Sequence, residues 1–548
     1  MERNAVLFLV LSVLIIIGYA LLVPPAPPSE SKPSSKGVPT PNGATPAETP
    51  KSSQSERVAE PFVPGPERTV TVETDLYRAE FSTRGGVIRS WRLKRYTNGP
   101  HNDIPIDLFT LGQGAAVIAP LAVMIDSTDE KLRTAALDAV YTLDGGDLQL
   151  SADHPSGVLR FEARLPGDQV VSKRLTFHHD SYRVDIELTI GGMSDPHRVM
   201  LGENFGIHQW GDANFVGYIG PTSRVNGVVI QDKPKKLEHS AEHAGTVSWT
   251  ALQDKYFIAA LMPDDQATTV VAEKLGEKRI TVGLKSGPSS ESTTRKYELY
   301  AGPKEYDLLV AMGNELDQTI DFGWFIYGSW AVVRLIAEPL FLILKTLHRI
   351  TNNYGVAIIL LTTLIKIVFI PLTHKSYMSM RAMQILQPQM QALQKKYKHD
   401  KVRLNQEMMT LYKTNKVNPL GGCLPMVLQI PFFVALFNIL YTTIELRQAP
   451  FIFWIHDLSE KDPSYLLPIL MGGTMFLQQK LQPTTMDPRQ AKVMLFLPVI
   501  FTFFFLNFPS GLVLYWMVNN LLSILQQYVT MKYLHPPVVV VPKTVPKG

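Results

Sequence analysis

Five stretches with few or no charged residues follow one another in the C-terminal part of this chain, and they constrain the fold more than any other feature. They are residues 354–372, 424–444, 465–477, 493–508 and 512–529. A helix rises ~1.5 Å per residue, so about 20 apolar residues cross the ~30 Å of bilayer hydrocarbon. We therefore predict an α-helical polytopic membrane protein with a five-helix core.

A sixth candidate span, residues 5–23, lies at the N-terminus and is preceded by Arg3. The alternative is a cleavable signal peptide. The apolar run exceeds the usual length of such a signal, and prolines at 24, 25, 27 and 28 replace the small residues of a cleavage site. The sequence favours an uncleaved anchor with its N-terminus in the cytoplasm.

Composition indicates that membrane and water-soluble parts are separate. The mean hydropathy of +0.04 and the 19% of charged residues would suit a soluble protein, and 548 residues exceed one ordinary domain. A formal charge of +4 says nothing about nucleic acid. The single cysteine, Cys423, excludes an internal disulfide, a cysteine-based metal site and a lipoprotein anchor.

Residues 24–66 are rich in Pro, Ser, Thr, Lys and Glu, which predicts a disordered tether. Over residues 67–320 the apolar period changes to two. The clearest run is residues 182–190, where apolar side chains at every second position alternate with Arg183, Asp185, Glu187 and Thr189. With Gly, Pro and Asp turns and hardly a helix, this segment predicts a large antiparallel β-sandwich.

Residues 321–350 are apolar on one side, carry several charges and contain Pro339, which favours an amphipathic helix on the outer membrane surface. The predicted domain order is therefore the following: anchor 1–23, tether 24–66, periplasmic β-sandwich 67–320, interfacial helix 321–350, core 351–530 with a cytoplasmic helical hairpin 374–418, and cytoplasmic tail 531–548.

The placement of charge predicts the topology. Residues 374–423 contain nine lysines or arginines and two acids, so this segment faces the cytoplasm. Residues 445–464 contain four acids and two basic residues, as expected of an outward loop. Six crossings then leave both termini in the cytoplasm and the β domain in the periplasm.

Lys366 is the most informative polar residue, because an ammonium within a span costs several kcal/mol unless it meets water, a partner or headgroups. The alternative is snorkelling over the seven residues to Thr373, about 10 Å, which strains a lysine stem. Polar residues on the same or other spans predict a hydrated groove; they include Thr362, Gln429, Asn438 and Asn519. Each alone is more often interhelical glue.

No acidic residue lies at membrane depth to neutralise Lys366, so a half-open groove that attracts acidic or polar client segments is favoured. Residues 465–477 and 493–508 are shorter than the hydrocarbon is thick. Either the local bilayer is thinned, or flanking polar residues extend these helices, and the sequence does not choose between the two.

The hairpin has helical spacing. Met383 and Met390 belong to an apolar stripe that forms the seam between its two helices or, in addition, contacts varied apolar clients. Its basic residues suit ribosomal RNA or anionic lipid, and those we expect to make cytoplasmic contacts are Lys395, Lys396, Lys398, Lys401 and Arg403. No nucleotide loop, metal signature or serine elbow is present in the sequence.

Three motifs resemble those of the YidC/Oxa/Alb membrane insertases: Asn-Pro-Leu-Gly-Gly-Cys-Leu-Pro at 418–425, Phe-Pro-Ser-Gly-Leu at 508–512 and Asn-Tyr-Gly at 353–355. The anchor, tether and β-sandwich resemble the Gram-negative YidC type. The resemblance implies a five-helix core around a hydrophilic groove that is open to cytoplasm and lipid. Lys366 aligns with the groove arginine of the family, and Thr362, Phe433, Tyr515 and Trp516 align with groove or client-contacting positions.

The expected function is therefore that of a membrane protein insertase and chaperone, not an enzyme, with no cofactor. It would act alone or beside the SecYEG translocon, on nascent membrane proteins delivered by the ribosome and the signal-recognition particle system. The C-terminal tail has only three lysines, so ribosome contact should rest on the hairpin. A small-molecule transporter is the alternative, although internal repeats are not evident. A third hypothesis makes the β-sandwich a sugar-binding or sugar-modifying domain, for which no catalytic carboxylates can be assigned.

Overall fold

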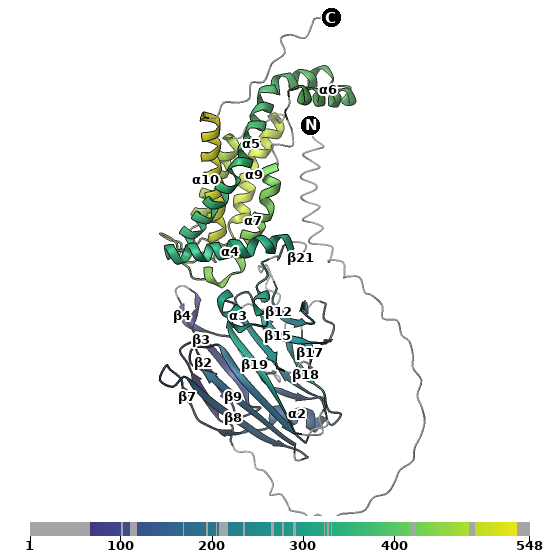
Figure 1. The fold of residues 1–548 in the computed structure, drawn as a ribbon, viewed down its shortest axis with the longest axis vertical. Helices are drawn as coiled ribbons and strands as arrows, with labels where there is room; N and C mark the ends of the chain where they lie inside the picture. The colour runs from purple at the N-terminus through teal and green to yellow at the C-terminus, as the bar shows by residue number, and fades with distance from the viewer. Residues whose placement is uncertain are drawn as a thin grey trace, which may run out of the picture.

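A β domain and a helical core make up the described part of the chain (Figure 1). The computed structural model describes residues 66–99, 102–109, 118–167, 169–192, 195–203, 205–207, 218–233, 236–264, 268–276, 279–288, 292–322, 324–325, 328–329, 331–415, 417, 424–481 and 488–533. The predicted anchor and tether, most of the 418–425 motif and the tail after Tyr533 lie outside these residues.

The β domain is built on a nine-stranded antiparallel sheet. In spatial order its strands are β13 (Val228–Gln231), β12 (Gly220–Val225), β15 (Val247–Gln253), β16 (Phe257–Pro263), β19 (Thr293–Pro303), β10 (Arg183–Gly191), β9 (Gln169–His178), β8 (Ser156–Leu165) and β6 (Thr142–Asp144). The alternation seen in the sequence is the reason: Ile186 is buried opposite Leu175 and Tyr297, whereas its neighbours face outward.

Two five-stranded sheets complete this domain. One has the order β4 (Asn102–Asp107), β3 (Val87–Gly99), β2 (Tyr77–Ser82), β1 (Thr69–Glu73), β7 (Leu148–Gln149), and the other has the order β14 (Ser240–Ala244), β17 (Thr268–Lys274), β18 (Ile280–Ser286), β11 (His197–Met200), β5 (Val123–Ile125). The first packs on the nine-stranded sheet through Phe81, whose ring lies 5.5 Å from that of Phe177.

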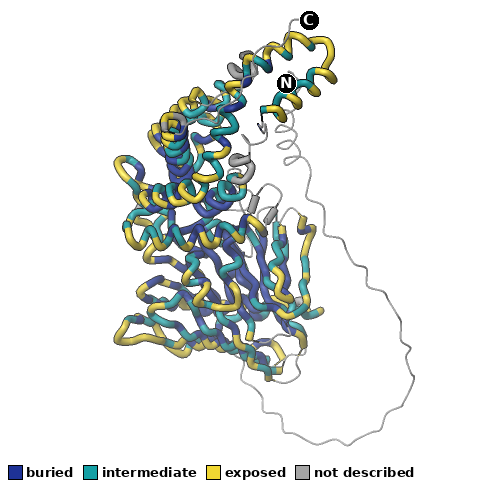
Figure 2. The backbone as a smooth tube through the Cα atoms, turned by 45° about the horizontal axis from the view of Figure 1, so that its top comes forward, coloured by how far each residue is buried: buried dark blue, intermediate teal, exposed yellow. Residues whose placement is uncertain are grey.

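The predicted antiparallel sandwich is confirmed, with two differences in detail. The β1–β7 pair is parallel, because β7 joins β1 from a distant part of the chain. Helices α2 (Glu130–Asp138) and α3 (Tyr306–Met312) also occur where none was predicted, and Asp129 caps α2 by accepting a bond from Lys131 N. Burial is densest between the sheets and along the inner side of the helices (Figure 2).

The helical core consists of seven helices in the described residues. They are α4 (Ala331–Thr351), α5 (Tyr354–Lys396), α6 (Lys401–Thr414), α7 (Leu424–Thr442), α8 (Leu466–Leu481), α9 (Pro488–Phe505) and α10 (Ser510–Tyr533). In Figure 1, α4 lies across the end of the upright helices that faces the β domain. Among the described residues, α5 alone is both long and apolar enough to cross a membrane; shorter apolar helical segments occur at Gln429–Thr442 and Met494–Phe505.

Three helices differ in extent from the prediction. Helix α4 begins at Ala331 rather than 321, because Trp324–Phe325 pairs with Gly328–Ser329 as a two-stranded ribbon. Helices α8 and α9 have 16 and 18 residues and continue into flanking polar residues such as Gln478. The extension supports the reading in which polar residues lengthen these helices, rather than the one that requires a thinned bilayer.

Helix α5 differs most. The sequence predicted a span ending at 372 and a separate first hairpin helix, yet α5 runs unbroken for 43 residues through Pro371 and Pro388. Its second half forms the hairpin with α6. In the seam Leu386 and Met390 are buried, with Met383 and Met408 against them.

The β domain rests on the loop between α7 and α8, residues 443–465, which we call the outer loop. The guanidinium of Arg447 donates to the carbonyl of Thr97 at 2.5 Å, and the amide of Gln448 donates to the same carbonyl at 3.1 Å. Lys255 places its ammonium 4.1 Å from the centre of the Tyr441 ring. These bonds join the two parts of the molecule away from their covalent connection.

Candidate functional site

Lys366 lies three turns into α5 and is half-buried against α10. Its ammonium donates to Ser523 Oγ at 2.8 Å, and Ser523 Oγ donates to the carbonyl of Asn519 at 2.7 Å. Among the described residues, Ser523 Oγ accepts a hydrogen bond from the ammonium, and no carboxylate forms an ion pair with Lys366. The ammonium therefore keeps donors for a group arriving from outside the protein.

Gln429 of α7 extends this arrangement to a third helix. Its amide donates to Asn519 Oδ1 at 3.0 Å. Lys366, Ser523, Asn519 and Gln429, which we call the polar network, thus connect α5, α10 and α7 through side chains. Each of these residues contributes a polar group that can donate or accept a hydrogen bond between the three helices.

An aromatic cluster borders the polar network on the side nearer the β domain. Tyr515, two turns before Ser523 on α10, lies 6.3 Å from the ring of Phe433, and Trp516 lies 4.8 Å from Phe433 edge to face. Trp516 also meets Phe505 at 5.0 Å. The cluster fills the interface between the helices on the β-domain side of the polar network. The polar groups therefore lie on the hairpin side of the aromatic rings.

Two residues assigned to the groove from sequence are placed differently. Thr362 is buried and its hydroxyl donates to the carbonyl of Ile358 within its own helix at 2.6 Å. Asn438 is 1% exposed and donates to the carbonyl of Phe322 at 2.6 Å, on the β-domain side of α7. The structure therefore brings Lys366, Gln429 and Asn519 together, groups Phe433 with Tyr515 and Trp516, and leaves Thr362 and Asn438 outside both sets.

Ser523 is the network member that sequence reasoning missed. Its signal was its spacing: Asn519 and Ser523 are four residues apart, so they lie on one face of α10. A second polar line on α10 faces α8, where Asn520 donates to Thr474 Oγ1 at 3.3 Å and Gln527 donates to the carbonyl of Leu481 at 2.6 Å. These bonds join helices directly and are the interhelical glue that isolated amides usually provide.

Two sequence motifs fasten the outer loop to the starts of α5 and α10. Asn353 caps α5 by accepting from Val356 N at 3.1 Å, and its amide donates to the carbonyl of Phe451 at 3.0 Å. Gly355 leaves room for the Phe451 ring, since a Cβ there would lie 2.0 Å from it. These contacts give the Asn-Tyr-Gly motif a structural role: Asn353 binds the outer loop at Phe451, and Gly355 leaves space for the Phe451 ring.

The second motif acts in the same way on α10. The amide and hydroxyl of Ser510 both donate to the carbonyl of Glu460, at 2.7 and 2.8 Å, and Gly511 N donates to the carbonyl of Leu458 at 2.8 Å. A Cβ at Gly511 would lie 3.1 Å from that carbonyl oxygen. The outer loop thus covers the β-domain end of the bundle and is held at both sides.

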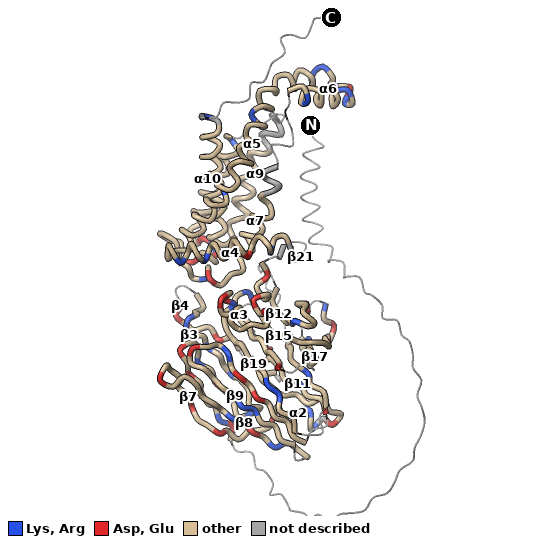
Figure 3. The backbone as a smooth tube through the Cα atoms, in the orientation of Figure 1, with Lys and Arg blue, Asp and Glu red and all other residues tan. Residues whose placement is uncertain are grey.

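The hairpin presents its charge at the opposite end of the bundle (Figure 3). The five basic residues expected to make cytoplasmic contacts are all exposed: Lys395, Lys396, Lys398, Lys401 and Arg403. Met383 and Met390 instead take part in the seam with α6. The exposed surface of the hairpin therefore carries these five basic residues together with apolar side chains such as Val402 and Met409, whereas Met383 and Met390 belong to its seam.

The described residues contain no group of three His, Cys, Asp or Glu side chains that could hold a metal ion. A cleft of about 590 Å³ in the β domain lies over β10, β19 and β15, with Asp185, Glu187 and Glu298 among its lining residues. Basic neighbours pair with these acids: the guanidinium of Arg183 lies 3.1 Å from Asp185, and that of Arg174 lies 3.3 Å from Glu187.

The sequence matches two protein families: the one described as 60Kd inner membrane protein over residues 346–536, and the YidC periplasmic domain over residues 69–343. A membrane protein insertase YidC of Syntrophus aciditrophicus is 41% identical, over 96% of this chain and 99% of that relative. The corresponding protein of Geotalea daltonii is 36% identical, over 96% and 98%. A solved structure described as an active YidC insertase is 19% identical, with a TM-score of 0.36, and covers 85% of this chain and 93% of that one.

Proposed function

This chain belongs to the YidC family of membrane protein insertases and is a membrane protein insertase of the inner membrane with a periplasmic β domain, and we propose that its polar network receives the polar end of each client. Its substrates are nascent membrane proteins. The observation that carries the proposal is the half-buried ammonium of Lys366, which is held by one hydroxyl and has no carboxylate partner among the described residues.

In the proposed mechanism the acidic or polar tail of a client is attracted to Lys366 from the hairpin side of the bundle. At an effective dielectric of about 20, one ammonium–carboxylate contact is worth up to about 4 kcal/mol, a gain that offsets part of the cost of moving the tail out of water. The apolar segment of the client meanwhile lies along the exposed apolar side of α5, which includes Leu360, Leu364 and Ile367. The tail is then released outward as the segment enters the lipid.

The proposal is tested by substituting Lys366 and measuring insertion of a small client with an acidic tail in proteoliposomes. Lys366→Ala and Lys366→Glu should lower the rate roughly tenfold or more, the effect of about 1.4 kcal/mol, whereas Lys366→Arg should retain it. Lys375→Ala is the matched control, since Lys375 is an exposed lysine on the same helix. Insertion at the full rate by the alanine variant would sink the groove mechanism.

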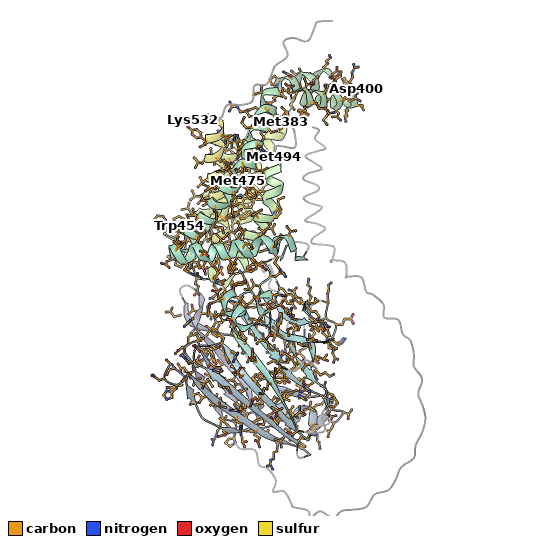
Figure 4. All side chains as sticks on the ribbon, viewed as in Figure 1. Met383, Asp400, Trp454, Met475, Met494 and Lys532 are labelled. Atoms are coloured by element: carbon orange, nitrogen blue, oxygen red, sulfur yellow. The ribbon has the colours of Figure 1, made fainter. Side chains whose placement is uncertain are left out.

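We also propose the finer topology and the partners. The basic hairpin, Met383 and Lys532 lie at the end of the bundle away from the β domain (Figure 4), which supports a cytoplasmic hairpin and a cytoplasmic C-terminus. The α4 helix at the opposite end would lie on the outer membrane surface. The lipid-facing sides of the helices would allow the protein to insert clients either alone or in contact with the SecYEG translocon.

The exposed basic residues of the hairpin support contact with the ribosome and the signal-recognition particle system. Binding of this kind weakens with salt, because each lysine or arginine near RNA releases counterions. Replacing the five basic residues with glutamine should lower ribosome cosedimentation and flatten its salt dependence. Unchanged cosedimentation would place the contact elsewhere on the chain.

A further inference from the structure

The tip of the outer loop, residues 452–454, presents the apolar side chains of Ile452 and Phe453 to the surroundings, whereas Trp454 is half-buried and packs against the core. Phe453 is 77% exposed and Ile452 is 49% exposed. Phe453 also has a φ of 56°, a left-handed backbone conformation that bulky residues rarely adopt and that costs on the order of 1–3 kcal/mol. Removing these exposed apolar side chains from water would stabilise the tip.

The tip is built rigidly. Phe451 N donates to the carbonyl of Ile455 at 3.0 Å, and Ile455 N donates to the carbonyl of Ile452 at 3.2 Å, so the chain turns sharply. The carbonyl of Phe451 is held by Asn353 at 3.0 Å. The ring of Trp454 stacks on that of Phe453, with centres 5.9 Å apart. The apolar tip therefore projects outward from a fixed base at the start of α5.

The level of the tip matches the outer boundary of the bundle. Figure 4 places Trp454 beside α4, at the end of the upright helices next to the β domain. Helix α4 exposes Leu335 and Ile350, each 74% exposed. On α5 an exposed apolar stripe begins at Val356, close to the bond between Asn353 and the Phe451 carbonyl. It continues through Leu360 and Leu364. In an inner-membrane protein this stripe faces lipid, and the tip continues it toward the headgroups.

We propose that the loop tip, Ile452-Phe453-Trp454, inserts into the outer leaflet of the bilayer at the boundary between headgroups and acyl chains, where aromatic side chains are favoured. The bound partner is lipid. Together with α4, the tip fixes the depth of the helical core in the membrane from its outer side. The bond from Asn353 to the Phe451 carbonyl fixes the tip to α5, and the bond from Ser510 to the Glu460 carbonyl fixes the outer loop to α10. The depth of the tip in the membrane therefore also sets the depth of these two helices, which carry part of the polar network.

Spin labels in full-length protein reconstituted into phosphatidylethanolamine–phosphatidylglycerol vesicles test this proposal. Single cysteines are placed at 453, 452 and 335 in a Cys423→Ser background, and at Lys461, an exposed position of the same loop, as the matched control. The ratio of collision with oxygen to collision with an aqueous nickel chelate is measured at each site. Labels at 453 and 452 should give a ratio several-fold higher than at 461 and close to that at 335.

The purified vesicles contain no other protein, so a high ratio at 453 reports lipid alone. A ratio at both 452 and 453 equal to that at 461 would overturn the proposal, and it would favour a protein partner for the tip instead. Each labelled variant is compared with its unlabelled parent by thermal unfolding, and site 452 serves where the label at 453 disturbs the turn.

Discussion

Ser523 gives a residue-scale prediction, because it positions Lys366 without offering charge of its own. Ser523→Ala removes the acceptor at 2.8 Å and frees the ammonium to adopt other rotamers, so insertion of acid-tailed clients should fall about threefold to tenfold. Ser523→Thr keeps the hydroxyl and should retain the rate. Insertion is measured as for Lys366, with Thr346→Ala on exposed α4 as the control hydroxyl.

A double substitution separates positioning from simple loss of stability. If Ser523 acts through Lys366, the Lys366→Ala and Ser523→Ala effects are not additive, and the double variant inserts no more slowly than Lys366→Ala alone. Additive losses, or failure of Ser523→Thr to restore the rate, would show that the serine supports packing rather than the lysine.

The limits of prediction from sequence are clear at this scale. Lys366, Gln429 and Asn519 could be found because polar residues within apolar stretches are conspicuous. Asn438 is equally conspicuous, yet its partner is the carbonyl of Phe322, which is 116 positions away and carries no sequence signal. Ser523 was missed because serine is common in helices and its acceptor role depends on which helix lies opposite.

Glu445 gives a pH-dependence prediction outside the spans. It lies in the short helix Ile444–Leu446 of the outer loop, and burial raises the pKa of its carboxyl to about 7, against the weaker opposing field of Lys345. Tyr306 N donates to it at 3.4 Å, and Glu305 adds like charge. Between pH 4.5 and 7 the folded state therefore holds more protons at this site than the unfolded chain, so its stabilising contribution is complete in acid and is lost as pH rises through 7.

The measurement is the free energy of unfolding of the full-length protein in detergent from pH 5 to 8, for the natural protein and for Glu445→Gln. One pKa unit corresponds to about 1.4 kcal/mol, so the difference between the two curves should change by a few kcal/mol at most. The glutamine variant should gain relative stability as pH rises. Parallel curves would contradict a buried, titrating carboxyl.

At the scale of elements, helix boundaries were harder to predict than helix existence. The apolar stretches of the C-terminal part predicted a helix at each of their five spans, and the basic residues after 372 predicted that the span ends there. They gave no signal that α5 would continue, since two prolines normally weaken a helix interior. The second half of α5 packs against α6 through Leu386 and Met390, and such contacts stabilise a helix through tertiary packing rather than through its own sequence.

Two neighbouring glycines in α8 provide an element-scale prediction. A Cβ at Gly472 would lie 1.9 Å from Thr502 Oγ1 of α9, whereas a Cβ at Gly473 meets nothing within 4 Å. Gly472→Ala should push the two helices apart and destabilise the protein by roughly 1–3 kcal/mol. Gly473→Ala should be neutral or stabilise by up to about 1 kcal/mol through helix propensity.

Thermal unfolding in detergent compares the two variants directly, because they differ by one position on one helix. Adding Thr502→Ala to Gly472→Ala removes the atom that the new methyl group meets, so it should recover most of the lost stability. Equal effects of the two glycine substitutions would mean that α8 and α9 do not pack as described.

At the scale of the whole molecule, the outer loop is where the β domain, α5 and α10 meet. Its Arg447 and Gln448 hold Thr97, its Phe451 carbonyl is held by Asn353, and its Glu460 carbonyl is held by Ser510. The sequence predicted this segment only as an acidic outward loop. Its joining role could not be predicted, because it depends on long-range bonds to backbone carbonyls, which every residue type carries.

The polar network and the β domain are built from different segments of the chain, and this separation predicts how the protein responds to truncation. The polar network comes from α5, α7 and α10 alone, whereas parts of residues 304–322 contact the core: the rings of Tyr306 and Phe322 lie 5.6 and 5.2 Å from that of Phe341 on α4, and the Phe322 carbonyl accepts from Asn438. Deleting 67–300 should therefore leave insertion close to that of the full chain. Extending the deletion to 322 leaves a buried amide without its partner, at a cost of about 1–3 kcal/mol, and should lower both stability and insertion. Both truncated proteins are measured in proteoliposomes at matched amounts; equal loss in the two would show that the β domain itself is needed for insertion.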